Sequence, residues 1–292
     1  MKNLVVFSGQ GNTSTKDLKN LIKTKQGQEL MKELNKSEQF STYVKKAINN
    51  DLGTISYDII STFISNEVTW RKISERYNVT YFTSYSAGIF NILSATKLVP
   101  IENIMQFILQ RIKLFESNNF KQKLYFVLSK SSEDINNLMS IIKKWSNAEW
   151  SIKISEQSGI IAIDKDEFFQ LKDMLKKESF KIILKDSGLS VPYHTSFLEP
   201  LKSEYINIVE SLFSHYKIEE SKNYTFILEE DNIKKEILRQ LDNNINWGTI
   251  VDRIIQGDFD NIFDTSPNNN LKKTLYKYYS YKNVQGSDGI WK

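Results

Sequence analysis

The sequence has no cysteine, and its 292 residues include only two histidines and four prolines. The lack of cysteine excludes disulfides, thiolate zinc sites and cysteine nucleophiles, and it fits a reducing compartment such as the cytoplasm. A reaction that needs an imidazole base must use His194 or His215. No apolar run approaches the ~20 residues of a membrane span. We therefore expect a cytoplasmic protein without a membrane partner.

The charge balance is also small, because 39 lysines and arginines face 35 acidic residues and leave a net charge of +4. This excess is spread along the chain and mildly favours anionic partners such as phosphates or an acidic protein. It is not the clustered basic stripe of a nucleic-acid binder. The tyrosine- and lysine-rich tail from Leu275 is predicted to be a terminal segment on the surface.

The most informative stretch follows a predicted buried strand at Val79–Thr83, which is β-branched or aromatic. Small residues come next, and apolar residues at helical spacing then continue to Pro100. A strand, a tight turn and a helix are the context of a nucleophile elbow, here with Ser86 at its tip. A strand-to-helix turn without chemistry is the alternative interpretation.

An arginine lies on the apolar stripe of the next predicted helix, Ile101 to about Asn118. The stripe passes through Ile104, Ile108, position 111 and Phe115. No carboxylate stands three or four positions from Arg111. Its guanidinium either reaches solvent along its aliphatic stem or faces an anion that the protein binds.

Two further regions complete the pattern. A first strand at residues 4–8 leads into Gly9-Gln10-Gly11, which is either a tight turn or a phosphate loop that lacks the usual third glycine and lysine. Residues 123–190 show the order βαββαβ, which is typical of a ferredoxin-like unit. We therefore predict a large α/β subdomain in two parts, 1–122 and 191–292 with the tail, and a small inserted subdomain at 123–190.

These features together resemble malonyl-CoA:acyl-carrier-protein transacylases and the acyltransferase domains of polyketide synthases, over nearly the whole chain. Phe7-Ser8-Gly9-Gln10-Gly11 is similar to the family's Phe-Pro-Gly-Gln-Gly, and Ser84-Tyr85-Ser86-Ala87-Gly88 stands at its Gly-His-Ser-Leu-Gly elbow. Arg111 lies 25 positions after Ser86, where the family has its substrate arginine, and His194 lies 108 positions after it in a Val-Pro-x-His context. Asn246-Trp247, the helix after it and the turn at Pro267 resemble the C-terminal block.

The resemblance implies an α/β acyltransferase fold with a hydrolase-like large subdomain and a ferredoxin-like small one. It implies that Ser86 attacks an acyl-CoA thioester and that His194 is the general base. Main-chain N–H groups of Gln10 and Ala87 would form the oxyanion hole. A main-chain carbonyl would orient the histidine, and Asn246 is the candidate for it. Arg111 would hold the malonyl carboxylate. The implied substrate is malonyl-CoA, the partner is an acyl carrier protein, and no metal or bound cofactor is needed.

Alternatives remain open at this point. An acyl hydrolase that clears carrier proteins would share Ser86 and His194, and Asp186 could then complete a hydrolase-type triad, although the resemblance argues against one. A non-catalytic docking homologue is the third possibility. The chain departs from the family pattern at Tyr85, Ile89 and Ile112. His215 has no motif around it and is predicted to be a surface helix residue.

Overall fold

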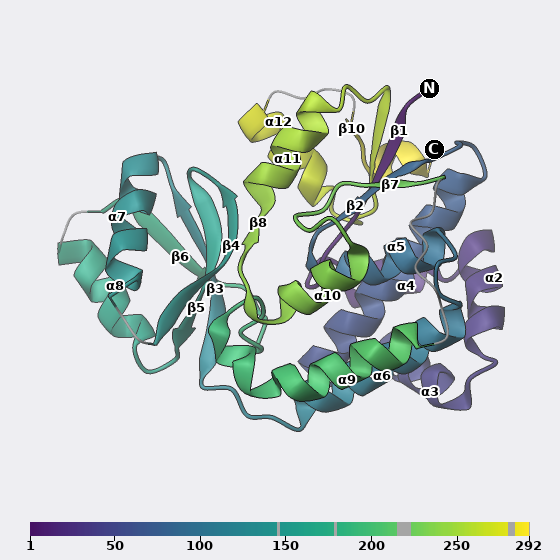
Figure 1. The fold of residues 1–292 in the computed structure, drawn as a ribbon, viewed down its shortest axis with the longest axis horizontal. Coiled ribbons are helices and arrows are strands. Elements are labelled where there is room, and N and C mark those ends of the chain that lie inside the picture. The colour runs from purple at the N-terminus through teal and green to yellow at the C-terminus, as the bar shows by residue number, and fades with distance from the viewer. Residues whose placement is uncertain (145–146, 178–179, 215–222, 280–283, 292) are drawn as a thin grey trace.

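The computed structural model describes residues 1–144, 147–177, 180–214, 223–279 and 284–291, and Figure 1 shows their arrangement. His215 and Tyr281 lie outside the described residues, so the predictions for them stay predictions. The described helices and strands form two parts, each built on its own five-stranded sheet. Among the described residues no helix is both long and apolar enough to cross a membrane.

The large part is built on a parallel sheet with the strand order β10-β9-β1-β2-β7. Its strands are β1 (Asn3–Phe7), β2 (Tyr81–Ser84), β7 (Thr225–Phe226), β9 (Asn261–Asp264) and β10 (Val284–Gln285). In this register Phe7 pairs with Ser84 at the carboxyl ends of β1 and β2. The loop after β1 and the turn after β2 therefore leave the sheet side by side, at the edge where open α/β sheets bind ligands.

Helices surround this sheet, and the longest of them lies in the core. They are α1 (Thr15–Leu21), α2 (Lys25–Leu34), α3 (Glu38–Asn49), α4 (Thr54–Ser74), α5 (Ile89–Ala95), α6 (Ile101–Glu116), α9 (Lys202–Phe213), α10 (Ile233–Asp242), α11 (Trp247–Gln256), α12 (Asn270–Tyr279) and the short α13 (Ser287–Ile290). Every residue of α4 from 59 to 69 is buried. A helix buried on all sides must carry its polar groups inside the protein, where they need partners.

The small part has the predicted βαββαβ order. It consists of β3 (Gln122–Ser129), α7 (Ser132–Ile142), β4 (Ala148–Ser155), β5 (Ser158–Asp164), α8 (Phe168–Lys177) and β6 (Ile182–Asp186). The antiparallel order β6-β3-β5-β4 is ferredoxin-like, and α7 and α8 cover the outer face of this sheet (Figure 1). The two-residue strand β8 (Ile245–Asn246) comes from the large part and pairs with β4. The predicted fold class is confirmed, whereas the subdomain boundaries stay predictions.

The prediction of a surface tail from Leu275 is wrong at Leu275 and Val284, while residues 280–283 between them lie outside the described residues. Leu275 on α12 is fully buried, and Val284 is buried as well. Val284 starts β10, which pairs with β9 and extends the large sheet by one strand. A strand of two residues carries no periodic signal, so the sequence alone could not reveal it.

Candidate active site

Ser86 lies at the start of a short 3₁₀ turn, η1 (Ser86–Gly88), between β2 and α5. Its φ of +52° is in the left-handed region that residues with side chains rarely adopt. A Cβ atom on Gly88 would lie 2.6 Å from the Phe7 carbonyl oxygen, and one on Gly9 would lie 2.7 Å from Tyr85 Cδ1. Both glycines therefore let the turn and the loop after β1 approach closely. A strained serine between strand and helix is the geometry of a nucleophile elbow.

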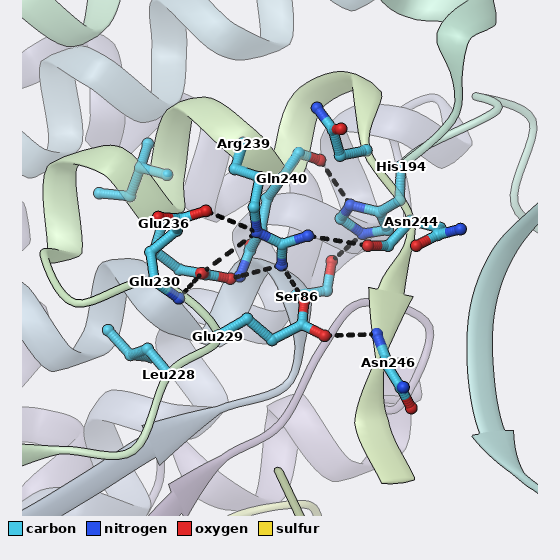
Figure 2. A network of polar contacts seen from close by, with 12 residues as sticks. Ser86, His194, Leu228, Glu229, Glu230, Glu236, Arg239, Gln240, Asn244 and Asn246 are labelled. Carbon is cyan, nitrogen blue, oxygen red and sulfur yellow. Dashed lines mark hydrogen bonds and ion pairs between the residues drawn. The ribbon is translucent and has the colours of Figure 1, made fainter. Parts of the chain in front are cut away.

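His194 faces this serine, as Figure 2 shows, with its Nε2 atom 2.7 Å from Ser86 Oγ. Its Nδ1 atom lies 2.5 Å from the main-chain oxygen of Gln240. Because a carbonyl oxygen only accepts hydrogen bonds, Nδ1 carries the ring proton. The free lone pair of Nε2 then accepts the hydrogen bond from the Ser86 hydroxyl.

The carbonyl that orients the histidine ring belongs to Gln240, so the prediction for Asn246 is wrong. Helix α10 ends at Asp242, and the last four carbonyls of a helix have no partner within it. The Gln240 carbonyl accepts from the imidazole, and the Leu241 carbonyl accepts from the His194 main-chain N–H at 3.1 Å. Asn246 instead caps α11, because its side chain accepts from the Thr249 N–H at 3.4 Å.

A cluster of charged residues fixes this end of α10 to its surroundings (Figure 2). The guanidinium of Arg239 forms ion pairs with Glu229 and with Glu236 and donates to the Asn244 carbonyl at 2.8 Å. Glu236 also accepts a hydrogen bond from the Gln240 side chain at 2.8 Å. The cluster thus joins α10 to the segments before and after it, next to the carbonyl that holds His194.

The surroundings of His194 keep its imidazole neutral. The pKa of His194 is lowered to about 3, mainly by burial and also by the positive charges of Arg111 and Arg239, while the hydrogen bond to Gln240 acts in the opposite direction. A neutral imidazole at physiological pH is ready to accept a proton. The end of α10 also places the negative end of a helix dipole beside the ring, which favours an imidazolium when one forms.

A cavity of about 450 Å³ lies over Ser86, between the two sheets. Its floor includes Gln10, Ser86 and His194, and Tyr193 and Trp247 lie beside them. The opposite wall comes from the small sheet and is largely apolar; it is lined by Leu124, Phe126, Leu128, Ile152, Ile154 and Ile160. The cavity therefore offers a polar reacting end and a long apolar wall.

Arg111 lies against this cavity through Tyr193, and its side chain is not part of the lining. The residue is only 5% exposed, so it does not reach solvent. Its guanidinium carbon is 5.3, 4.9 and 5.4 Å from the ring centres of Phe90, Phe115 and Tyr193. Within the described part of the chain, Nε and Nη1 have no hydrogen-bond partner. A buried guanidinium with free donors suits an anionic ligand.

The other predicted site residues differ in their surroundings. Gln10 lines the cavity and its side chain donates to the Tyr193 hydroxyl at 3.3 Å, while Ala87 follows Ser86 and is buried. Asp186 is half exposed and pairs with Lys123 at 2.5 Å. Because Gln240 occupies Nδ1 of His194, the structure does not assemble the hydrolase-type triad through Asp186.

The chain has the fold of malonyl-CoA:acyl-carrier-protein transacylases. A crystal structure of FabD from Acinetobacter baumannii superimposes with a TM-score of 0.83 at 16% identity, covering 99% of this chain and 96% of that one. The malonyl-CoA:acyl carrier protein transacylase from Helicobacter pylori gives 0.79 at 20% identity, covering 99% and 96%. A malonyl-transacylase in complex with a type II PKS acyl-carrier protein gives 0.79 at 14%, covering 98% and 95%. No protein-family model and no curated protein matches the sequence.

Sequence reasoning missed two parts of the site. Gln240 contributes through its main chain, so its side chain gives no signal. Residues 230–241 look helical in the sequence, and the end of that helix could have pointed to free carbonyls. Asn66 and Asn91 form a buried amide pair beneath the elbow, with Asn66 Nδ2 donating to Asn91 Oδ1 at 3.0 Å. Asn66 is a polar residue among the apolar positions of a predicted helix, and a polar side chain inside a buried helix needs a partner.

Proposed function

We propose that the protein is an acyltransferase that moves a malonyl-type group from CoA to the phosphopantetheine thiol of an acyl carrier protein through an acyl-serine. The observation that carries the proposal is the 2.7 Å contact between Ser86 Oγ and a neutral His194 at an elbow under a cavity. The fold supports it, because the similar structures are transacylases by name and one contains an acyl-carrier protein. We propose a stand-alone enzyme of a fatty-acid or polyketide synthase.

The first half-reaction forms the acyl-enzyme. Ser86 Oγ attacks the thioester carbonyl carbon while its proton passes to His194 Nε2, and main-chain N–H groups of Gln10 and Ala87 stabilise the oxyanion. The imidazolium that forms is stabilised by the Gln240 carbonyl at Nδ1. When the tetrahedral intermediate collapses, the carbon–sulfur bond breaks and the CoA sulfur takes the proton from His194.

The second half-reaction reverses these steps with another thiol. The phosphopantetheine thiol gives its proton to His194 and attacks the acyl carbonyl, and the Ser86 oxygen leaves and recovers the proton. One serine thus serves two thiols in turn, which is a ping-pong mechanism. The cavity of about 450 Å³ gives both thiol arms a shared route to Ser86 along the apolar wall of the small sheet.

Arg111 provides the selectivity for a malonyl-type group. Its buried Nε and Nη1 atoms are N–H donors without a partner among the described residues, so a carboxylate could accept a charge-assisted hydrogen bond from this guanidinium. The substrate carboxylate would complete an ion pair that the buried guanidinium lacks in the free protein. A malonyl carboxylate held there fixes the thioester carbonyl in one pose next to Ser86.

Intact-mass spectrometry after mixing with malonyl-CoA tests the proposal. We expect one malonyl adduct per chain, located on the peptide that contains Ser86. Ser86→Ala should give no adduct, and His194→Ala should acylate far more slowly because the serine loses its base. A protein that forms no adduct with a panel of acyl-CoAs would instead be a non-catalytic docking homologue.

A further inference from the structure

A buried asparagine beneath the site holds the loop that follows β1. Asn66 on α4 is 0% exposed. Its Oδ1 atom accepts from the Ser8 main-chain N–H at 3.2 Å and from the Ser8 hydroxyl at 2.9 Å, and its Nδ2 atom donates to the Ser8 carbonyl at 2.9 Å. The amide therefore pairs with both main-chain groups of Ser8, as a neighbouring strand would. Ser8 is two residues before Gln10.

The same amide is tied to the helix behind the elbow. Asn66 Nδ2 also donates to Asn91 Oδ1 at 3.0 Å. Asn91 lies on α5, which begins directly after the turn of Ser86, and its Nδ2 atom donates to the Phe63 carbonyl and to Glu67, both at 3.0 Å. The Thr265 hydroxyl, just after β9, donates to Asn66 Oδ1 at 2.6 Å. Asn66 thus joins β1, α5 and the end of β9.

We propose that Asn66 is a positioning residue that sets the distance between the two main-chain N–H groups of the oxyanion hole. This inference rests on the proposed function, which assigns those groups to Gln10 and Ala87. The first group lies on the loop that Asn66 holds through Ser8, and the second precedes the helix that Asn66 holds through Asn91. A single rigid amide therefore connects the two halves of the hole.

The physical need for such a connection comes from the loop itself. Ser8 lies beyond β1, so its main-chain groups have no sheet partner. At this buried position Asn66 Nδ2 donates to the Ser8 carbonyl, and Asn66 Oδ1 shares the Ser8 N–H with the Thr265 hydroxyl, which accepts at 3.1 Å. Oxyanion donors act only when they lie at hydrogen-bond distance from the forming charge. A displacement of about 1 Å at a reacting centre can lower a rate about 100-fold.

The test compares Asn66→Ala with two control variants on the same helix. Ser65→Ala removes a neighbouring buried hydroxyl that has no hydrogen-bond partner among the described residues. Val68→Ala destabilises buried α4 without touching the amide pair. For Asn66→Ala we expect kcat for acylation by malonyl-CoA to fall about 10- to 100-fold with KM changed less than twofold, measured on folded protein below its melting temperature. Both controls should keep kcat within about twofold of wild type.

A second probe separates this inference from the proposed function. An alkyl fluorophosphonate phosphonylates an activated serine: a bond forms between Ser86 Oγ and phosphorus, fluoride leaves, and the serine proton passes to His194. The phosphoryl oxygen uses the same oxyanion hole without any acyl-CoA. Wild type should be labelled at least tenfold faster than Asn66→Ala.

Each outcome of the two probes has a defined meaning. If fluorophosphonate shows this difference while malonyl-CoA gives no adduct, the positioning role holds and the proposed substrate is wrong. Equal labelling of wild type and Asn66→Ala would overturn the positioning role, as would absence of labelling in wild type. A kcat loss in Val68→Ala equal to that in Asn66→Ala would show that Asn66 acts through stability alone.

Discussion

If the proposed function holds, replacing Arg111 with alanine should shift the preference of the enzyme from malonyl-CoA toward neutral acyl-CoAs. Arg111 is 5% exposed, and its Nε and Nη1 atoms have no hydrogen-bond partner among the described residues. A hydrogen bond between charged groups contributes about 1.5–3 kcal/mol. For the charge-assisted contact between a buried guanidinium and a carboxylate we take the upper value of about 3 kcal/mol, which is about a 100-fold loss in kcat/KM for malonyl-CoA.

The same substitution should affect acetyl-CoA in the opposite direction. Removing the side chain leaves a space bounded by the rings of Phe90, Phe115 and Tyr193, which suits an apolar acyl group. We therefore expect the acetyl rate to stay within about twofold of wild type or to rise. Arg111→Lys is the matched control, because it keeps the charge but loses the planar guanidinium, and its malonyl loss should be intermediate.

The assay is the rate of acyl-enzyme formation with each acyl-CoA, followed by quenched-flow mass spectrometry. The ratio of malonyl to acetyl kcat/KM is the quantity that reports the clamp, since it cancels any loss of folded protein. An unchanged ratio in Arg111→Ala would show that the arginine is structural, and the malonyl assignment would then be wrong.

Three other predictions follow from the charges in the site. A protonated His194 cannot act as a base, and its pKa is lowered to about 3. The rate of acylation should therefore fall on the acid side only well below pH 6.5. A midpoint near pH 6.5 in the pH–rate profile would contradict the buried, neutral imidazole. Burial raises the pKa of Glu67 to about 7, so its contribution to stability falls as pH rises from about 4.5 through 7. The free energy of unfolding of Glu67→Gln, measured in urea, should therefore rise by about 2–3 kcal/mol relative to wild type between pH 5 and 8. A pH-independent difference would refute this. Arg239→Met leaves the buried Glu236 without its cation and should lower the free energy of unfolding by about 3 kcal/mol, whereas a change below about 0.5 kcal/mol would mean that the cluster does not hold α10.

The sequence predicted those parts of the molecule that have a local pattern of side-chain types. The β-branched strand, the small turn and the helix around Ser86 agree with β2, η1 and α5, and the order βαββαβ agrees with the small part. The apolar stripe of α6 correctly placed Arg111 on a buried face. In each case the pattern of side chains along the sequence follows the period of the helix or strand, so the sequence is sufficient to predict that element.

The parts that escaped prediction depend on contacts between distant segments. Residues 14–50 look helical in the sequence, and the structure divides them into α1, α2 and α3, because Thr24 and Ser37 cap new helices with side-chain hydrogen bonds. The carbonyl at His194 comes from Gln240, a main-chain group that any residue could supply. The strand β10 exists only because β9 offers it an edge.

The lifetime of the acyl-enzyme separates a transferase from a hydrolase most directly, because both would share Ser86 and His194. Malonyl-enzyme freed of excess malonyl-CoA should persist in buffer, since a carboxylate held by Arg111 fixes the ester in one pose and gives water no preferred approach. Addition of a phosphopantetheinylated carrier protein should discharge the ester rapidly and transfer the malonyl mass to the carrier. We predict a large difference between the two lifetimes. If water clears the ester at the same rate with and without the carrier, the protein is a hydrolase and the proposed function is wrong.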